Sequence, residues 1–145
     1  MVDQLSHQGK NNLNPFNLKH FDCTDISIVV NGVNEPAEPY KLNIPDGDYM
    51  TLYSEFLTNM GIVNEDRDCG ITPADFVGGN FMVIFDRNKD KCNRFHRHPY
   101  DTGAIDINIR SKTNLPSTAV VLVYATYSSE IIIDDKDNVT IVKNF

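Results

Sequence analysis

The sequence predicts an all-β protein, an antiparallel two-sheet sandwich of seven or eight strands with one inserted amphipathic helix. The first observation is the stretch after Gly103, where Ile105, Ile107 and Ile109 alternate with polar residues. A period of two is typical of a strand with one buried and one solvent-exposed face. The second observation is a series of seven or eight short apolar runs separated by turn signals. The third is one helical stripe of apolar residues between these runs.

Three strands are predicted in the part of the chain before residue 90. Apolar residues alternate over 26–30 and lead into Asn31-Gly32, a dipeptide that favours a hairpin turn. A strand over 38–44 is preceded by Pro36 and Pro39, which favour an edge position because proline cannot donate to a ladder. Residues 81–85 form a third apolar run, which ends in a polar segment.

The helical stripe spans residues 49–60, where apolar side chains recur at spacings of three and four. Gly61 is placed to end this helix, and we expect its apolar face to dock on the sheet. A second, shorter helix is predicted to begin after Thr72, a good N-cap followed by proline and an acidic first turn.

The C-terminal part predicts four more strands. Residues 105–110 form the alternating strand, and residues 119–127 form a longer run that we expect to be deeply buried. The runs 131–133 and 139–142 flank the polar segment 134–138, which predicts a hairpin. Periodicity alone does not separate a jelly roll from an immunoglobulin-like sandwich. The Cys-Trp-Cys pattern that is typical of immunoglobulin domains is missing from this sequence.

Length and charge narrow the function. A chain of 145 residues predicts one domain, here residues 14–145 after a flexible N-terminal arm over 1–13. The net charge of −7 argues against direct nucleic-acid binding, because a phosphate backbone requires clustered basic residues. The absence of a signal peptide or of an apolar run of about 20 residues predicts no secretion and no membrane span. Three widely spaced cysteines fit free thiols in a reducing compartment.

Two segments resemble metal sites without matching one. Cys92, His96 and His98 could supply zinc ligands, but the paired spacing of a structural zinc site is missing, and a solvated loop is the alternative. The acidic segment 134–138 lacks the ligand spacing of a calcium loop and suits a turn. No nucleophile, catalytic pair or phosphate loop is identifiable. The sequence therefore predicts no catalytic residues, no cofactor and no metal, and a protein that is not an enzyme.

An aromatic segment after the N-terminal arm supplies the candidate contact residues. It contains Pro15, Phe16, Leu18 and Phe21. These side chains could cover the chain's own sheet, or they could dock on a neighbouring domain or subunit, as exposed apolar residues in assembly surfaces do.

The ordered series of motifs resembles the C-terminal jelly roll of the double jelly-roll major capsid proteins of Polinton/Maverick elements and adintoviruses, and related proteins of invertebrate genomes. The resemblance runs from Asn14 to the C-terminus, about nine-tenths of the chain. It is carried by these segments: 14–21, Val30-Asn31-Gly32, Tyr40, 49–53, 81–86, 103–110, Leu115-Pro116, 120–127, Ile133-Asp134 and Asn138-Val139.

The resemblance implies that the sandwich is an eight-stranded antiparallel jelly-roll sandwich with one inserted amphipathic helix, and that the chain is a structural capsid protein without catalytic residues. In that family two tandem jelly rolls form one subunit and three subunits form a capsomer, so the implied partner is a neighbouring capsid jelly roll or a second copy. The implied location is the virion, or the cell interior for a host-adopted copy. The chain has room for one jelly roll only, and Thr126 replaces a usually acidic residue. The alternative is a free-standing ligand- or glycan-binding β-sandwich module.

Overall fold

The computed structural model describes residues 1–63, 65–87, 103–126, 129–135 and 138–143. The described residues contain seven strands in antiparallel sheets and three short α-helices, which confirms a strand-rich protein of the all-β class. An eighth strand is not present among them, so the jelly-roll arrangement stays a prediction. The strands are β1 (Val2–Asp3), β2 (Cys23–Val30), β3 (Val33–Lys41), β4 (Ile105–Ser111), β5 (Ala119–Val120), β6 (Ser129–Ile133) and β7 (Val139–Lys143). The helices are α1 (Gln4–His7), α2 (Met50–Asn59) and α3 (Pro73–Gly78), with a 3-10 turn at Ile44–Asp46.

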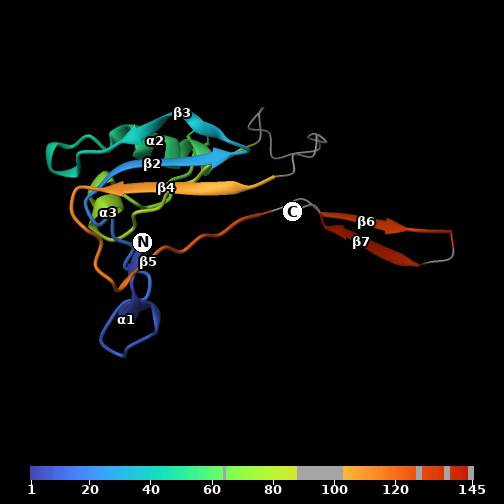
Figure 1. Cartoon of the computed structure of the whole chain (residues 1–145), viewed down its shortest axis with the longest axis horizontal. Coiled ribbons are helices and arrows are strands. Elements are labelled where there is room, and N and C mark those ends of the chain that lie inside the picture. The colour runs from blue at the N-terminus through green and yellow to red at the C-terminus, as the bar shows by residue number, and fades with distance from the viewer. Residues whose placement is uncertain (64, 88–102, 127–128, 136–137, 144–145) are drawn as a thin grey trace.

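A three-stranded antiparallel sheet in the order β3-β2-β4 forms the centre of the molecule (Figure 1). The alternation predicted in β2 is confirmed, because Ile26, Ile28 and Val30 are each at most 5% exposed. Ile28 lies opposite Ile107 of β4, and Val30 lies opposite Ile105. Residues directly opposite in an antiparallel pair share a face, so the isoleucines of β4 lie on the face of β2 that is buried.

The turn between β2 and β3 has the predicted chemistry. Asn31 and Gly32 both have positive φ, 51° and 83°, as a two-residue hairpin turn of the primed type requires. The predicted edge position of β3 is also confirmed, since β2 is its only partner among the described strands. The ladder shifts between Ile26 and Ile28, where residues 36–39 with their two prolines have no paired partner.

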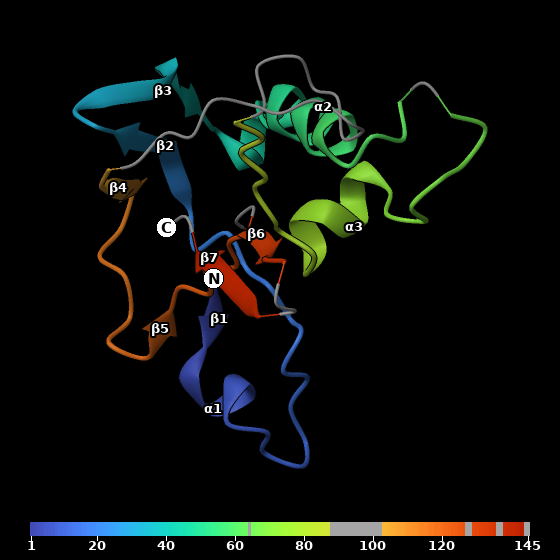
Figure 2. The ribbon, with the colours of Figure 1, turned by 90° about the vertical axis from the view of Figure 1, so that its right-hand side faces the viewer.

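The main core lies between the sheet and helices α2 and α3, which cover one of its faces (Figure 2). Leu52 and Phe56 of α2 are 1% exposed, and Phe76 of α3 is fully buried. The Phe76 ring lies 5.3 Å from the rings of both Phe56 and Phe81, distances at which aromatic pairs attract. The helix predicted over 49–60 is thus confirmed, and it docks on the sheet as expected.

Helix α3 begins where its sequence predicts. The Thr72 hydroxyl accepts a hydrogen bond from the Asp75 N–H at 3.2 Å, and the Asp75 carboxylate accepts one from the Thr72 N–H at 3.1 Å. This reciprocal capping box satisfies two N–H groups that a helix leaves unpaired at its start. It places Phe76 one residue later, in the middle of the core.

The prediction of a strand over 81–85 is wrong. These residues form no ladder, and a single bridge between Leu18 and Asn80 precedes them. The Ile84 carbonyl accepts a hydrogen bond from the Asn59 side chain at 2.7 Å, so a helix side chain satisfies a group that a strand would pair. The apolar residues of this run pack instead on the core, with Phe81 4% exposed.

The first residues of the chain contain secondary structure that the sequence did not predict. Strand β1 pairs with β5, with Val2 opposite Val120, and Val2 is fully buried. Helix α1 follows, with the Asp3 side chain accepting from the Leu5 N–H at 3.0 Å as its N-cap. The flexibility of residues 1–13 and the boundary after them stay predictions.

The expectation of one long, buried strand over 119–127 is wrong for the described residues. Strand β5 covers only 119–120, and residues 121–126 continue without strand pairing. All six are exposed, because no described element packs on either side of them. Tyr127 lies outside the described residues.

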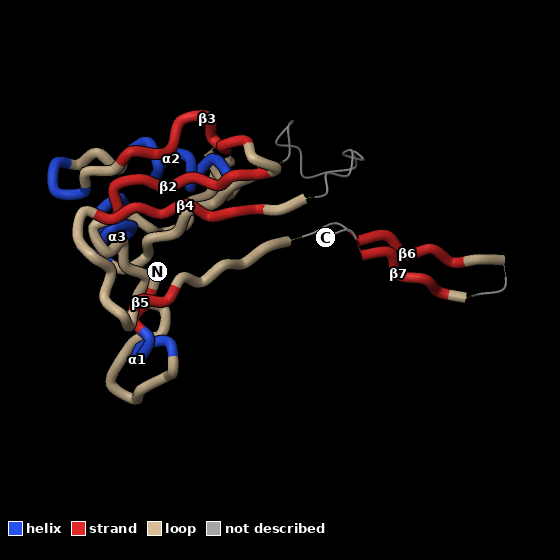
Figure 3. Tube along the Cα trace, viewed as in Figure 1, coloured by secondary structure: helices blue, strands red, loops and turns tan. Residues whose placement is uncertain are grey.

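The C-terminal hairpin is confirmed as a local structure. Strands β6 and β7 pair with Ile131 opposite Ile141 and Ile133 opposite Val139. In the described residues each has the other as its only strand partner, and the hairpin extends away from the rest of the molecule (Figures 1 and 3). A two-stranded hairpin standing alone in water is marginally stable at best.

Candidate functional site

Side chains suited to catalysis or metal binding do not converge in the described residues. No group of three or more His, Cys, Asp or Glu side chains is placed there to hold a metal ion. The potential zinc ligands Cys92, His96 and His98 lie outside the described residues. In the described part of the chain, no helix has the length and apolar character that crossing a membrane requires.

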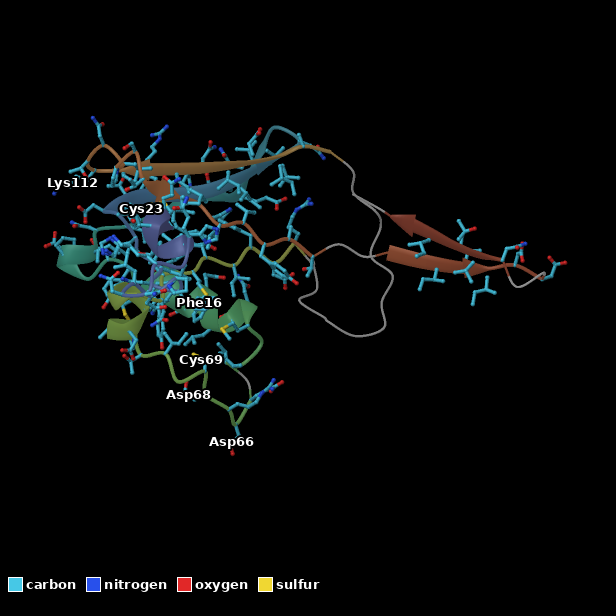
Figure 4. The ribbon with its side chains drawn as sticks, turned by 90° about the horizontal axis from the view of Figure 1, so that it is seen from below. Phe16, Cys23, Asp66, Asp68, Cys69 and Lys112 are labelled. Carbon is cyan, nitrogen blue, oxygen red and sulfur yellow. The ribbon has the colours of Figure 1, made fainter. Side chains whose placement is uncertain are left out.

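The two described cysteines are separate and differ in environment. Cys23 is 2% exposed in the core, and burial raises the pKa of its thiol to about 11. A thiol with that pKa is almost entirely protonated at neutral pH and is a poor nucleophile. Cys69 is half-buried on a different segment, beside a loop whose outer end carries Asp66 (Figure 4).

The acidic segment after β6 has the geometry of a turn. The Asp134 carboxylate accepts from the Asn138 N–H at 2.8 Å and from the Asn138 side-chain amide at 2.7 Å. The Asp134 N–H in turn donates to the Asn138 carbonyl at 3.1 Å. Both carboxylate oxygens of Asp134 thus close the hairpin, which supports the turn interpretation over a calcium loop.

Two hollows on the surface have volumes that can be compared with those of ligand sites. The larger, about 410 Å³, is lined by Lys41, Leu42, Asn43, Gly47, Asp48, Met50 and Thr51. Its lining has no aromatic side chain, whereas ligand pockets are lined mainly by apolar and aromatic residues. The smaller, about 150 Å³, contains an ion pair between Arg87 and Glu35 at 3.2 Å. Beside that pair, burial and then the Glu55 charge raise the pKa of Tyr40, which therefore stays a neutral phenol.

The four candidate contact residues of the aromatic segment do not form one patch. Leu18 is held against the core segment, since its N–H donates to the Gly79 carbonyl at 2.7 Å and its carbonyl accepts from the Phe81 N–H at 3.0 Å. Pro15 and Phe21 are half-buried. Phe16 is 77% exposed, at the position labelled in Figure 4. Of the four, Phe16 has the exposure that a contact with a partner needs, and that contact stays a prediction.

Among the described residues, the largest exposed apolar surface lies in the C-terminal part, which we call the arm and define as residues 121–126, 129–135 and 138–143. The exposed fractions of its large apolar side chains are Val121 45%, Leu122 47%, Val123 63%, Tyr124 90%, Ile131 63%, Ile132 48%, Ile133 64%, Val139 62% and Ile141 58%. The hairpin register places Ile131, Ile133, Val139 and Ile141 on one face. Contiguous apolar surface of this kind marks an interaction site in a folded protein.

A second unpartnered feature lies on the sheet. Among the described strands β4 pairs only with β2, so its outer edge is open. Ile109 at one end of β4 packs on the core, whereas Ile107 and Ile105 are 42% and 45% exposed. This corrects the expectation of a fully buried face along the strand, because helices α2 and α3 cover only the end near Ile109. The alternation of apolar residues in β4 predicted this apolar face. The alternation does not indicate which other part of the molecule, or which partner, covers the face.

The root of the arm is fixed by polar contacts. The Thr118 hydroxyl donates to the Asp3 carboxylate at 2.8 Å, and the Gln4 N–H donates to the Thr118 carbonyl at 2.8 Å. The Thr118 hydrogen bond is the main cause that lowers the pKa of Asp3, followed by the Leu5 N–H. The arm therefore leaves the molecule from a defined point beside β1.

Comparisons with protein-family models, curated proteins and solved structures found no match to this chain.

Proposed function

We propose that this chain is a structural, capsid-type jelly-roll domain that functions by assembling with neighbouring subunits, and that it is not an enzyme. The observation that carries the proposal is the exposure of nine large apolar side chains in the arm. Exposed apolar surface of this extent is unusual in a protein that functions as an isolated monomer and is typical of a surface that binds a partner. The antiparallel, strand-rich architecture is compatible with this proposal. In it, the sheet β3-β2-β4 would be the part of a jelly roll that is paired within one chain, and the other strands would find their partners when subunits assemble.

The sequence resemblance supports the finer identification. It implies the C-terminal jelly roll of a double jelly-roll major capsid protein, with a neighbouring jelly roll as partner. In the residues that the structure describes, no group of three or more His, Cys, Asp or Glu side chains is placed to hold a metal ion. Direct binding of nucleic acid is not part of the proposal, because the net charge is −7.

The test is structure determination of the protein in its assembled state. The purified chain is concentrated, examined by electron microscopy for arrays or shells, and solved at a resolution that shows strand order. Ordered assemblies with two four-stranded sheets in jelly-roll order are the expected result. A monodisperse monomer at high concentration, or strands in immunoglobulin order, would contradict the proposal.

The second candidate function is a ligand- or glycan-binding module. The observation in its favour is the hollow of about 410 Å³ beside β3 and α2, because its volume lies in the range of ligand pockets. A glycan array, followed by Lys41→Ala and Asp48→Ala variants, tests it. Binding that both variants abolish would favour this module over the capsid proposal.

A further inference from the structure

We propose that the arm of one copy pairs with the open edge of β4 in a second copy, so that two or more copies exchange their C-terminal segments. The inference rests on the proposed function and names the partner surface within it. The donor is the run 121–126 with the hairpin beyond it, and the acceptor is β4 (Ile105–Ser111) with its two exposed isoleucines.

The donor and the acceptor have matching backbone chemistry. Residues 121–126 have no strand partner among the described residues and run as a long, straight segment in Figure 1, and β4 offers one open edge among the described strands. Unpaired strand edges are templates for β-addition by another segment. The lengths agree as well, since the run has six described residues and β4 has seven.

The side chains match in the same way. Every position from 121 to 125 is apolar, so either register of the run brings apolar side chains onto the face that carries Ile105 and Ile107. The nine exposed side chains of the arm together present on the order of 1,000 Å² of surface, comparable to the roughly 800 Å² per partner of a standard interface.

The chain's own β4 is a poor acceptor because the root of the arm is held elsewhere. Val120 is paired with the fully buried Val2, and Thr118 is bonded to Asp3. Figures 1 and 2 both show β5 set apart from β4, with the loop 112–118 between them. Pairing of the run 121–126 with a second copy leaves this anchored root in place.

The exchange is compatible with a closed, symmetric assembly. Because each copy carries one donor and one acceptor, two copies can exchange arms reciprocally in a dimer, or several copies can each bind the next one in a ring. An extended run of six residues spans about 20 Å, which separates the hairpin from its own sheet and lets it reach a neighbour.

The first experiment compares two valines that are almost equally exposed. Val123 in the arm is 63% exposed, and Val33 at the start of β3 is 65% exposed. Light scattering coupled to size-exclusion chromatography is run on the wild type, Val123→Asp and Val33→Asp over a concentration series up to about 100 μM. We expect a wild-type oligomer whose dissociation constant rises at least tenfold in Val123→Asp and is unchanged in Val33→Asp. Circular dichroism checks that both variants are folded.

A second experiment identifies the contact directly. A photo-crosslinking amino acid at position 123 is introduced into a mixture of isotopically light and heavy protein. We expect mixed light–heavy crosslinks to the peptide that contains β4. Crosslinks confined to one copy, or a wild type that stays monomeric throughout the concentration series, would overturn the inference.

The two proposals fail in different ways. If Val123→Asp forms the same ordered shells as the wild type, the arm exchange is wrong and the capsid function stands. If the wild-type oligomer depends on Val123 but its strands follow immunoglobulin order, the exchange stands and the capsid function is wrong.

Discussion

The central sheet and the arm are built from the same kinds of residue and differ in what covers them. Ile26 and Ile28 in β2 are 4% and 5% exposed, whereas Ile131 and Ile133 in β6 are 63% and 64% exposed. All four lie in antiparallel ladders. The difference is that Ile26 belongs to the core that the sheet forms with helices α2 and α3, while no described element packs on the hairpin. Strand formation and burial are therefore separate properties, and only the second requires a partner.

The largest expected difference between the two regions is in backbone hydrogen exchange. In dilute, monomeric protein the amides of β2 should exchange at least about 1,000-fold more slowly than free peptide, because they open only with the core. The amides of 121–126 have no strand partner among the described residues and should exchange almost freely. Exchange followed by mass spectrometry measures both. Strong protection of 121–126 in a monomer would remove the distinction between the regions.

A matched pair of substitutions tests the same difference as free energy. Ile26→Ala should lower the free energy of unfolding by about 2–5 kcal/mol, because it leaves a cavity in the core. Ile133→Ala removes the same atoms from an exposed position and should change it by less than about 0.5 kcal/mol in the monomer. Urea denaturation of both variants provides the measurement. Equal effects would mean that the hairpin is packed in solution.

Sequence patterns were informative about local structure and less so about its partners. Two residues with positive φ at Asn31-Gly32, the capped α3 and the alternation in β4 were all readable, since each depends on neighbours along the chain. The lack of strand pairing at residues 81–85 was not readable from the sequence. The Asn59 side chain, from a distant helix, bonds to the Ile84 carbonyl, and such a contact leaves no pattern in the neighbouring residues. The pairing of Val2 with Val120 left no local signal at all.

The candidate site shows the same division. The apolar runs of the arm were visible, and the expectation that they are buried in their own sheet was wrong for residues 121–126. The sequence left open whether Phe16 and Leu18 cover their own sheet or contact a partner; in the structure Phe16 is 77% exposed, whereas the backbone of Leu18 is bonded to Gly79 and Phe81. An alternating pattern specifies which side chains need cover and leaves open whether the same chain supplies it.

A smaller effect on stability is expected from a substitution at the start of α3. This substitution tests how much the helices that cover the sheet contribute to the difference between the two regions. Thr72→Ala removes the N-cap and should destabilise the protein by about 1 kcal/mol. Thr58→Ala is the control, because the Thr58 hydroxyl bonds only to the Ser54 carbonyl one turn earlier in α2. Thermal denaturation measures both variants. A loss in Thr58→Ala as large as in Thr72→Ala would contradict a specific role for the cap.

The smallest expected effect is on the response to acid. Hydrogen bonds from the Thr72 side chain and backbone lower the pKa of Asp75 below its ordinary value of 3.8. Its contribution to stability is therefore present above pH 3.8 and is lost as the pH falls through the lower, folded pKa. Asp75→Asn should then match the wild type more closely at pH 2 than at pH 7 in urea denaturation. A constant difference between the two across this range would contradict the assignment.

The pairing of β1 with β5 has a consequence for the order in which the chain acquires its structure. Asp3 and Thr118, whose side chains are bonded, are 115 positions apart in the sequence. Contacts so distant form late, because a long loop must close before they contribute. During synthesis, Val2 remains without its strand partner until residue 120 has been made, long after β2, β3 and α2 are available. The direction in which the arm leaves the molecule is thus set at the end of folding, when a neighbouring copy can already be present.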